Sequence, residues 1–220
     1  MINVCCFFMT HNLLYFWIFC FVLFSCNTSS KKEIQTEKVS KITETKSSVN
    51  KIETLAQIPL AYQTIDSLVQ QKSVDSSSFS YNCAGEKSGK VTYYRKNKKL
   101  ILVEKRYAEY SHTEGKDQYF IKDGQPFFVF RKITVWSFDG KAKVEGATID
   151  KVTEKRFYLV NGKLEKCLQK QYEISSTAKE DVDPTRIENK KSDCPSVENL
   201  LTDYNVLLSH KNQHTNIECL

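Results

Sequence analysis

The histidines near the C-terminus have the spacing of a catalytic metal site. His210 and His214 are one helical turn apart, as are the two zinc ligands that one helix supplies in many metalloproteases. That pattern requires Glu directly after the first histidine, but Lys211 occupies the position. Glu218 and Cys219 could complete a weak site, whereas a frayed polar C-terminus explains the same residues more simply. We therefore predict no metal and no cofactor.

A second group of candidate catalytic residues lies in the middle of the chain. His112, Glu114 and Asp117 occur within "SHTEGKDQ", and a histidine close to two carboxylates could provide general acid–base catalysis. The same stretch is typical of a polar hairpin loop. Glycine is scarce, with 7 in the chain, and the sequence contains no glycine-rich loop that could hold a phosphate. These observations predict that the chain is not an enzyme, and a hydrolase remains the alternative.

The cysteines indicate an oxidising compartment rather than redox catalysis, because no C-x-x-C motif occurs. Beyond Cys26 the chain contains Cys83, Cys167, Cys194 and Cys219, an even number that allows two disulfides in three possible pairings. We predict a bridge between Cys83 and Cys194, which would connect the first strand to the last helix. Cys167 is also compatible with a buried free thiol.

Basic residues gather between Glu86 and Arg106, with tyrosines among them. We predict that six of these residues contact an anionic surface: Lys87, Lys90, Arg95, Lys96, Lys98 and Lys99. Anionic lipid head groups, lipopolysaccharide or wall polymers would suit them, because each basic residue near a membrane contributes about 1 kcal/mol. Ordinary solvation, with lysines that protect an edge strand from aggregation, is the alternative. Nucleic acid is not expected as a partner of an exported chain.

The N-terminal segment contains no Lys, Arg, Asp or Glu as far as Cys26, so the net charge of +6 belongs to the rest of the 220 residues. Its continuous apolar part, Leu13 to Phe24, has about a dozen residues, which fits a secretory signal and is shorter than the roughly 20 of a membrane span. Translation could start at Met1 or at Met9. An uncleaved anchor and a buried helix are the alternatives to a signal peptide.

The apolar segment ends in "LFSC", which resembles the lipobox of bacterial lipoproteins. Leu23 is the aliphatic residue of that pattern, Ser25 the small one, and Cys26 the cysteine. The resemblance implies a signal peptide over residues 1–25, cleavage before Cys26 and lipidation of its thiol. It also implies a membrane partner and a location in the bacterial cell envelope.

The segment after Cys26 is rich in Ser, Thr, Lys and Glu and contains no aromatic residue as far as Asn50. Such a composition cannot bury enough apolar area to offset the conformational entropy of the chain. We therefore predict a lipidated cysteine and a flexible tether over residues 26–50, with a loose helix from Glu33 to Glu44 as the alternative. Asn27 and Thr28 show no obvious retention signal, which favours the outer membrane, facing the periplasm.

Two segments with helical spacing of apolar residues enclose a β-rich region. The first stripe, after Pro59, consists of Ala61, Ile65, Leu68 and Val69. The second, after Pro195, consists of Val197, Leu200, Leu201, Tyr204 and Leu208. Both prolines stand where the first turn of a helix accepts them. We predict one domain over residues 51–210, followed by a flexible C-terminus over residues 211–220.

One eight-residue pattern occurs three times in the β-rich region, as "YYRKNKKL" from Tyr93, "YFIKDGQP" from Tyr119 and "FYLVNGKL" from Phe157. Asp-Gly and Asn-Gly between β-rich runs are strong signals of a tight hairpin turn. Asn97-Lys98 departs from them, so a longer or less tight turn is expected there. The unequal intervals between the copies exclude a regular solenoid.

The repeated turns resemble those of small β-meander lipoproteins from bacterial envelopes, over roughly residues 79–174. We predict an α+β fold with an antiparallel β-meander sheet of about six to eight strands, packed by an N-terminal and a C-terminal helix. The function expected is that of a tethered binding or inhibitory module for an envelope protein or anionic envelope polymer. A structural or assembly lipoprotein is the alternative.

Overall fold

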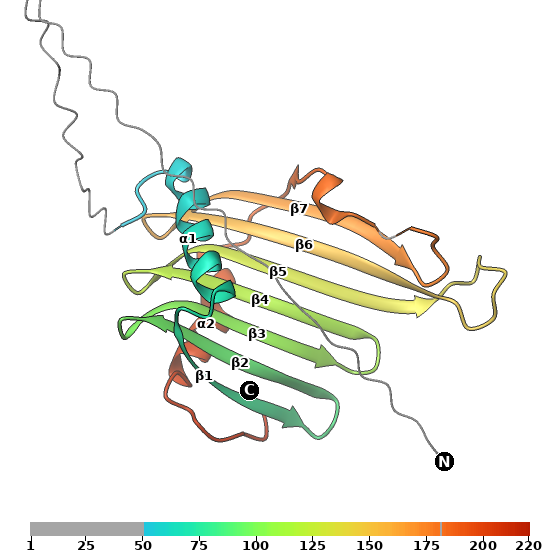
Figure 1. Ribbon diagram of the computed structural model, residues 1–220, viewed down its shortest axis with the longest axis horizontal. Coiled ribbons are helices and arrows are strands. Elements are labelled where there is room, and N and C mark those ends of the chain that lie inside the picture. Colours follow the sequence, from blue (N-terminus) through green and yellow to red (C-terminus); the bar gives the residue numbers. More distant parts are fainter. Residues whose placement is uncertain (1–50, 181) are drawn as a thin grey trace, which may run out of the picture. The chain divides into compact units, whose positions relative to one another are not determined.

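The sheet is a meander in which every strand pairs antiparallel with its neighbours in sequence (Figure 1). The computed structural model describes residues 51–180 and 182–220. Within these ranges the eight strands are β1 (Asp75–Cys83), β2 (Lys87–Lys96), β3 (Lys99–Glu109), β4 (Thr113–Lys122), β5 (Gln125–Phe138), β6 (Thr148–Val160), β7 (Lys163–Ser175) and β8 (Lys190–Lys191). The predicted antiparallel α+β meander is confirmed.

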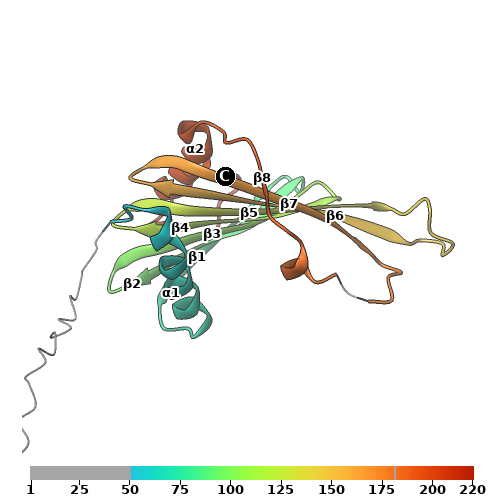
Figure 2. The same ribbon diagram turned by 90° about the horizontal axis from the view of Figure 1, so that it is seen from above.

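The two α-helices cover opposite faces of the sheet, as the view from above shows (Figure 2). The helical elements are η1 (Leu55–Gln57), α1 (Ile58–Gln70), η2 (Pro184–Arg186) and α2 (Val197–Ser209). Pro59 lies in the first turn of α1, as predicted, and the Oγ of Ser196 caps α2 by accepting a hydrogen bond from the Asn199 N–H at 3.1 Å. No helix within the described ranges is both long enough and apolar enough to cross a membrane.

All three copies of the repeat form the same tight hairpin, with two residues between the strands. The turns are Asn97-Lys98, Asp123-Gly124 and Asn161-Gly162, and all of these residues have positive φ. Positive φ at both central residues matches the right-handed twist of the flanking strands. The prediction of a longer turn at Asn97 was wrong, because Lys98 adopts a φ of 65° although it is not glycine.

Each tight turn is followed by a shift of register at the same place in the repeat. The shifts fall between Tyr94 and Arg95, between Phe120 and Ile121, and between Tyr158 and Leu159. One strand of each pair therefore carries one extra residue, a β-bulge, which bends the hairpin and changes which residues face each other beyond it. The repeat thus encodes a turn together with a bulge.

Apolar side chains cover both faces of the sheet. The register aligns Tyr93, Val103, Tyr119, Val129, Phe157 and Cys167 on the face that α2 covers. On the face that α1 covers, it aligns Tyr94, Leu102, Phe120, Phe128 and Tyr158. Burial of a large apolar side chain contributes about 1.5–3 kcal/mol. Two hydrophobic layers therefore hold the sheet between the helices.

Two glycines on the α2 face accommodate tyrosine rings from the neighbouring strands. A Cβ at Gly89 would lie 2.7 Å from ring atoms of Tyr81, and one at Gly115 would overlap the ring of Tyr107. Gly89 and Gly115 lie directly opposite Tyr107 across the adjacent strand pairs. The glycines therefore let aromatic rings lie flat on the backbone of the next strand.

Gly115→Ala is expected to lower the free energy of unfolding by about 1–3 kcal/mol, because the new methyl group must displace the Tyr107 ring. Urea unfolding of the two proteins measures the change. Gly140→Ala is the matched control, since a Cβ at that position meets no atom within 4 Å. Equal stabilities of the two variants would show that Tyr107 moves aside without cost.

The disulfides differ from the predicted pairing. Cys83 is bonded to Cys219, and Cys167 is bonded to Cys194. The predicted Cys83–Cys194 bridge was wrong because the segment before α2 lies along β7, where the Ser192 N–H donates to the Cys167 carbonyl oxygen at 3.1 Å and Cys194 comes next to Cys167. Cys167 is accordingly not a free thiol.

The segment after α2 returns to the outer side of β1 rather than extending freely. The Ile217 N–H donates to the Ser80 carbonyl oxygen at 3.0 Å, and the Asn82 N–H donates to the Glu218 carbonyl oxygen at 3.1 Å. These bonds and the Cys83–Cys219 disulfide fix residues 216–219 along the strand. The predicted domain end at residue 210 and the flexible C-terminus beyond it therefore need correction, because the tail belongs to the folded unit.

Candidate anion-binding site on the sheet

Four basic side chains form a line across the α1 face of the sheet, one from each of the strands β2 to β5. The register places Lys90 opposite Arg106, Arg106 opposite Lys116, and Lys116 opposite Lys132. Adjacent strands are about 4.8 Å apart, so the line extends over roughly 14 Å. We call these four residues the basic row.

The basic row lines a hollow in the surface of about 730 Å³. Small side chains form much of its floor and walls: Ser80, Asn82, Ser88, Ala108 and Thr134. Glu114 is the acidic residue among the lining residues. Figure 1 shows that α1 crosses the sheet near the tight turns, and that no other helix of the described residues lies on this face of β1–β4. The hollow is therefore open to a ligand.

The charges of the basic row are only partly compensated. Glu104 accepts hydrogen bonds from the Nε of Arg106 and from the amide of Gln118, each at 2.7 Å. In the described part of the chain, Lys90, Lys116 and Lys132 form no ion pair within 4.0 Å. An anion in the hollow would thus meet three uncompensated ammonium groups.

The protonation of Lys116 reflects its crowded position. Burial lowers the pKa of this ammonium group below its usual value, and the nearby charges of Arg106 and Lys132 act in the same direction, against Glu104 and Glu154. Its Nζ lies 5.4 Å from the centre of the Phe130 ring. A half-buried ammonium group with other cations nearby is stabilised in its charged form by a bound anion. Lys116 therefore has the properties expected in an anion-binding site.

An acidic side chain ends the line at β6. Glu154 accepts hydrogen bonds from Arg156 at 2.6 Å and from the hydroxyl of Tyr172 at 2.9 Å, and Lys170 lies 3.4 Å away. Burial raises the pKa of this carboxyl, but the bonds from Arg156 and Tyr172 outweigh it, so the pKa lies below its usual value. This compensated cluster confines the uncompensated charge to β2–β5.

The six basic residues that the sequence predicted as an anionic-surface contact do not form one surface. Lys90 belongs to the basic row, whereas Lys87 and Arg95 lie on the opposite face of β2. Arg95 donates to Ser77 Oγ at 2.8 Å, and Lys87 lies 3.8 Å from Glu109. These two basic residues therefore have local partners.

The remaining three of those residues lie at the turn between β2 and β3. Lys96 donates to the Ser73 carbonyl oxygen at 2.7 Å, while Lys98 and Lys99 are exposed. Lys116 and Lys132 were missed because they come from other hairpins. Their alternation with the buried residues of β4 and β5 was the signal that could have revealed them.

His112, Glu114 and Asp117 are not brought together. The His112 ring packs on Trp136 with centroids 4.1 Å apart, and Glu114 lines the hollow on the α1 face. Asp117 is buried on the α2 face with Arg131, whose Nε is 3.7 Å from its Oδ2. This geometry does not support acid–base catalysis by the three residues.

His210 and His214 do not share a helix face, because α2 ends before His210. The Nδ1 of His210 lies 3.0 Å from the Val206 carbonyl oxygen, and its ring is 5.8 Å from that of Phe79. Within residues 51–180 and 182–220, no group of three or more His, Cys, Asp or Glu side chains could hold a metal ion. Among the described histidines, His112 and His210 thus have local contacts and His214 is exposed.

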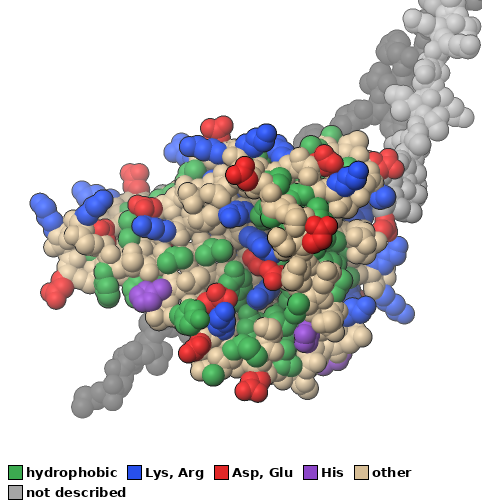
Figure 3. Space-filling view, turned by 180° about the vertical axis from the view of Figure 1, so that it is seen from behind, with side chains coloured by type: hydrophobic (Ala, Val, Ile, Leu, Met, Phe, Trp, Pro, Cys, Tyr) green, Lys and Arg blue, Asp and Glu red, His purple; other side chains and the backbone are tan. Residues whose placement is uncertain are grey.

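The α2 face carries mixed charges instead of a row of one sign. Figure 3 shows this face, over which acidic and basic side chains are interspersed. Arg131 donates from Nη2 to the Tyr119 hydroxyl and to Asp203 of α2, both at 3.0 Å. Burial raises the pKa of Asp117 to about 6, although Arg131 and Lys105 oppose the shift. This cluster joins α2 to the sheet.

Comparison with protein-family models, with curated proteins and with solved structures gives no match. The fold and the candidate site alone describe this protein as an antiparallel α+β meander with a basic hollow on one face of the sheet.

Proposed function

We propose that this chain is a lipid-anchored protein of the bacterial envelope, and that its folded part binds an anionic envelope polymer in the hollow of the basic row. The observation that carries the proposal is the alignment of Lys90, Arg106, Lys116 and Lys132 across four adjacent strands. A linear polyanion lying across the strands would meet one cation at each strand. Clefts lined by one sign of charge also concentrate ligands of the opposite sign.

Separate observations support the proposed compartment. Two disulfides support export, because such bonds persist in oxidising compartments and are rare in the cytosol. The lipobox-like sequence before Cys26 supports a lipid anchor, with the outer membrane, facing the periplasm, as the expected location. Cys26 and the tether lie outside the described residues. Mass measurement of the mature chain tests the anchor.

Lys90→Gln combined with Lys132→Gln is expected to weaken binding of inorganic polyphosphate roughly 30-fold, since each basic residue contributes about 1 kcal/mol. Isothermal titration calorimetry of the mature chain at about 0.15 M salt, where the Debye length is about 8 Å, measures the affinity. Added salt is expected to weaken the wild-type complex further.

Lys87→Gln combined with Lys155→Gln is the matched control, because it removes the same charge from the α2 face. Its affinity for polyphosphate is expected to change by no more than about twofold, since distant charges are screened. Equal losses in both double variants would show that net charge alone attracts the polymer, and would contradict a site at the basic row.

A further inference from the structure

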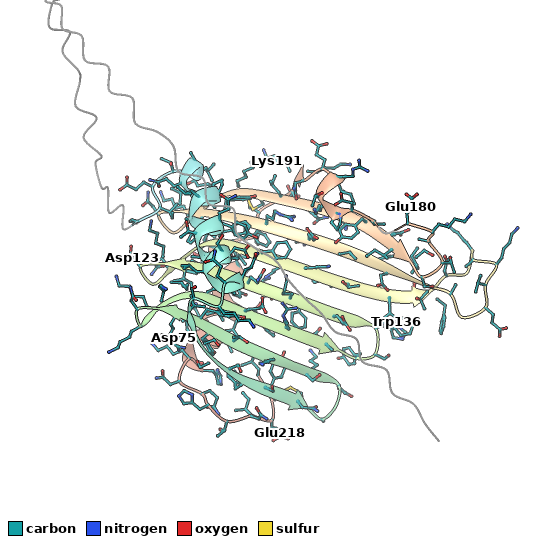
Figure 4. The ribbon with its side chains drawn as sticks, viewed as in Figure 1. Asp75, Asp123, Trp136, Glu180, Lys191 and Glu218 are labelled. Atoms are coloured by element: carbon teal, nitrogen blue, oxygen red, sulfur yellow. A yellow bond between two sulfur atoms is a disulfide. The ribbon has the colours of Figure 1, made fainter. Side chains whose placement is uncertain are left out.

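All three tight turns lie at one end of the sheet, together with the start of the described chain (Figure 1). We call this end the turn end, and define it by Lys51–Leu60, Lys96–Lys99, Lys122–Gln125 and Asn161–Lys163. The Asn161 N–H donates to the Ile52 carbonyl oxygen at 3.3 Å, which joins the chain entry to the last turn. Figure 4 shows Asp123 at this end and Trp136 toward the opposite one.

The turn end is positively charged. Five of its lysines form no ion pair among the described residues: Lys51, Lys98, Lys99, Lys122 and Lys163. The acidic residues of the same segments are Glu53 and Asp123. The basic row lies farther along the same strands, away from the turns that carry these lysines.

Apolar side chains are exposed among these lysines. Leu60 of α1 is 71% exposed and Leu55 of η1 is 41% exposed. Beside them is a hollow of about 600 Å³ between α1 and two of the turns, lined mainly by apolar atoms. Its charged lining residues are Lys96, Lys99, Lys122 and Asp123. Leucines surrounded by lysines are typical of a surface that lies in a membrane interface.

We propose that the turn end docks onto a bilayer of anionic lipids, with Leu55 and Leu60 entering the head-group region and the lysines contacting lipid phosphates. The inference rests on the lipid anchor of the proposed function. A tether from Cys26 to Asn50 could extend to at most about 80 Å, so the anchor alone leaves the orientation of the domain free. The described chain begins at Lys51, at the end that carries the lysines and the exposed leucines.

Docking at this end would leave the basic row accessible. The basic row is on the α1 face of the sheet. The hairpin between β5 and β6 points away from the turn end (Figure 1). A polymer could therefore bind across the strands while the turn end remains on the membrane. The two sites use different residues and can be tested separately.

The test compares Leu60→Trp with Phe138→Trp in the full chain, reconstituted into vesicles that contain brominated phosphatidylcholine. Phe138 is the matched control, because it is 70% exposed but lies at the far end of β5. With phosphatidylglycerol in the vesicles, the added emission of Leu60→Trp is expected to shift to the blue and to fall by about half through quenching at interfacial depth. The emission of Phe138→Trp is expected to stay unchanged.

Charge reversal provides the second arm. Lys98→Glu, Lys99→Glu and Lys122→Glu together should return the Leu60→Trp emission to its value in vesicles of phosphatidylcholine alone. Equal quenching of the two tryptophan variants, or quenching that ignores phosphatidylglycerol, would overturn the inference. Polyphosphate affinity of the same charge-reversed protein should change by no more than about twofold. A chain without lipid on Cys26 would refute the anchor, whereas a lipidated chain without selective quenching would refute the docking alone.

Discussion

Replacement of Cys83 and Cys219 together by alanine is expected to lower the free energy of unfolding by about 5 kcal/mol, because the lost bridge closes a very long loop. The two cysteines are 136 residues apart in sequence. The loss also frees the tail that pairs with Ser80 and Asn82. Urea unfolding under non-reducing conditions measures the difference.

The second bridge provides the comparison. Cys167 and Cys194 are 27 residues apart, so their joint replacement by alanine is expected to cost about 3.5 kcal/mol from loop closure. Titration of free thiols in the unfolded wild type verifies that both bridges are formed. If the variant without Cys83 and Cys219 is as stable as the wild type, closure of the long loop contributes no net stability, and the prediction is wrong.

The free energy of unfolding of the wild type is expected to contain a contribution from Asp117 that rises as the pH falls from about 7 to 4. Asp117→Asn is expected to remove this contribution. Burial raises the pKa of Asp117 from 3.8 to about 6 in the folded protein. The folded state thus binds this proton more tightly than the unfolded state does, and the penalty for the charged carboxylate is relieved on acidification. The change amounts to roughly 2–3 kcal/mol at 1.36 kcal/mol per pKa unit.

The groups around Asp117 explain why the carboxylate is poorly compensated. Arg131 approaches its Oδ2 only to 3.7 Å, and Asp117 Oδ1 and Arg131 Nε have no hydrogen-bond partner in the described structure. Lys105 on β3 favours the charged form, whereas Asp203 on α2 and Glu109 on β3 oppose it. The Asp117 carboxyl therefore gains from protonation.

The measurement is the difference in unfolding free energy between the wild type and Asp117→Asn across this pH range. Glu154 acts in the opposite sense, since its pKa is lowered, but its contribution is lost only below the usual value of 4.5. Asp123→Asn is the control, because the third hairpin has Asn161 at the same position of its turn. A pH-independent difference between the wild type and Asp117→Asn would show that folding does not shift the pKa of the Asp117 carboxyl, and would contradict the prediction.

Local sequence determines the hairpins of this fold well and its long-range closure poorly. Asp123-Gly124 and Asn161-Gly162 predict their turns because both central residues need positive φ. Asn97-Lys98 forms the same turn because pairing along β2 and β3 offsets the cost of positive φ at Lys98. The direction of α2 across the strands, which decides the partner of Cys83, depends on packing between distant residues.

The basic row could not be predicted from the turns alone, because each bulge changes the pairing. Lys96 pairs with Lys99 at the turn, and continuing that register would place Lys105 opposite Lys90. The extra residue after the turn places Arg106 there instead. A shift of one residue moves a side chain to the other face of the sheet. The site thus depends on a detail of backbone geometry that charge patterning does not encode.

The tail along β1 also has a consequence for how the protein is made. An outer strand with free N–H and C=O groups can recruit a strand from another copy, which leads to aggregation. Residues 216–219 are synthesised after all eight strands, so this side of β1 stays unprotected until these residues have been made and Cys219 has been oxidised. A chain held under reducing conditions would therefore leave this side of β1 open to pairing with another strand, and formation of the Cys83–Cys219 bridge would cover it at Ser80–Asn82.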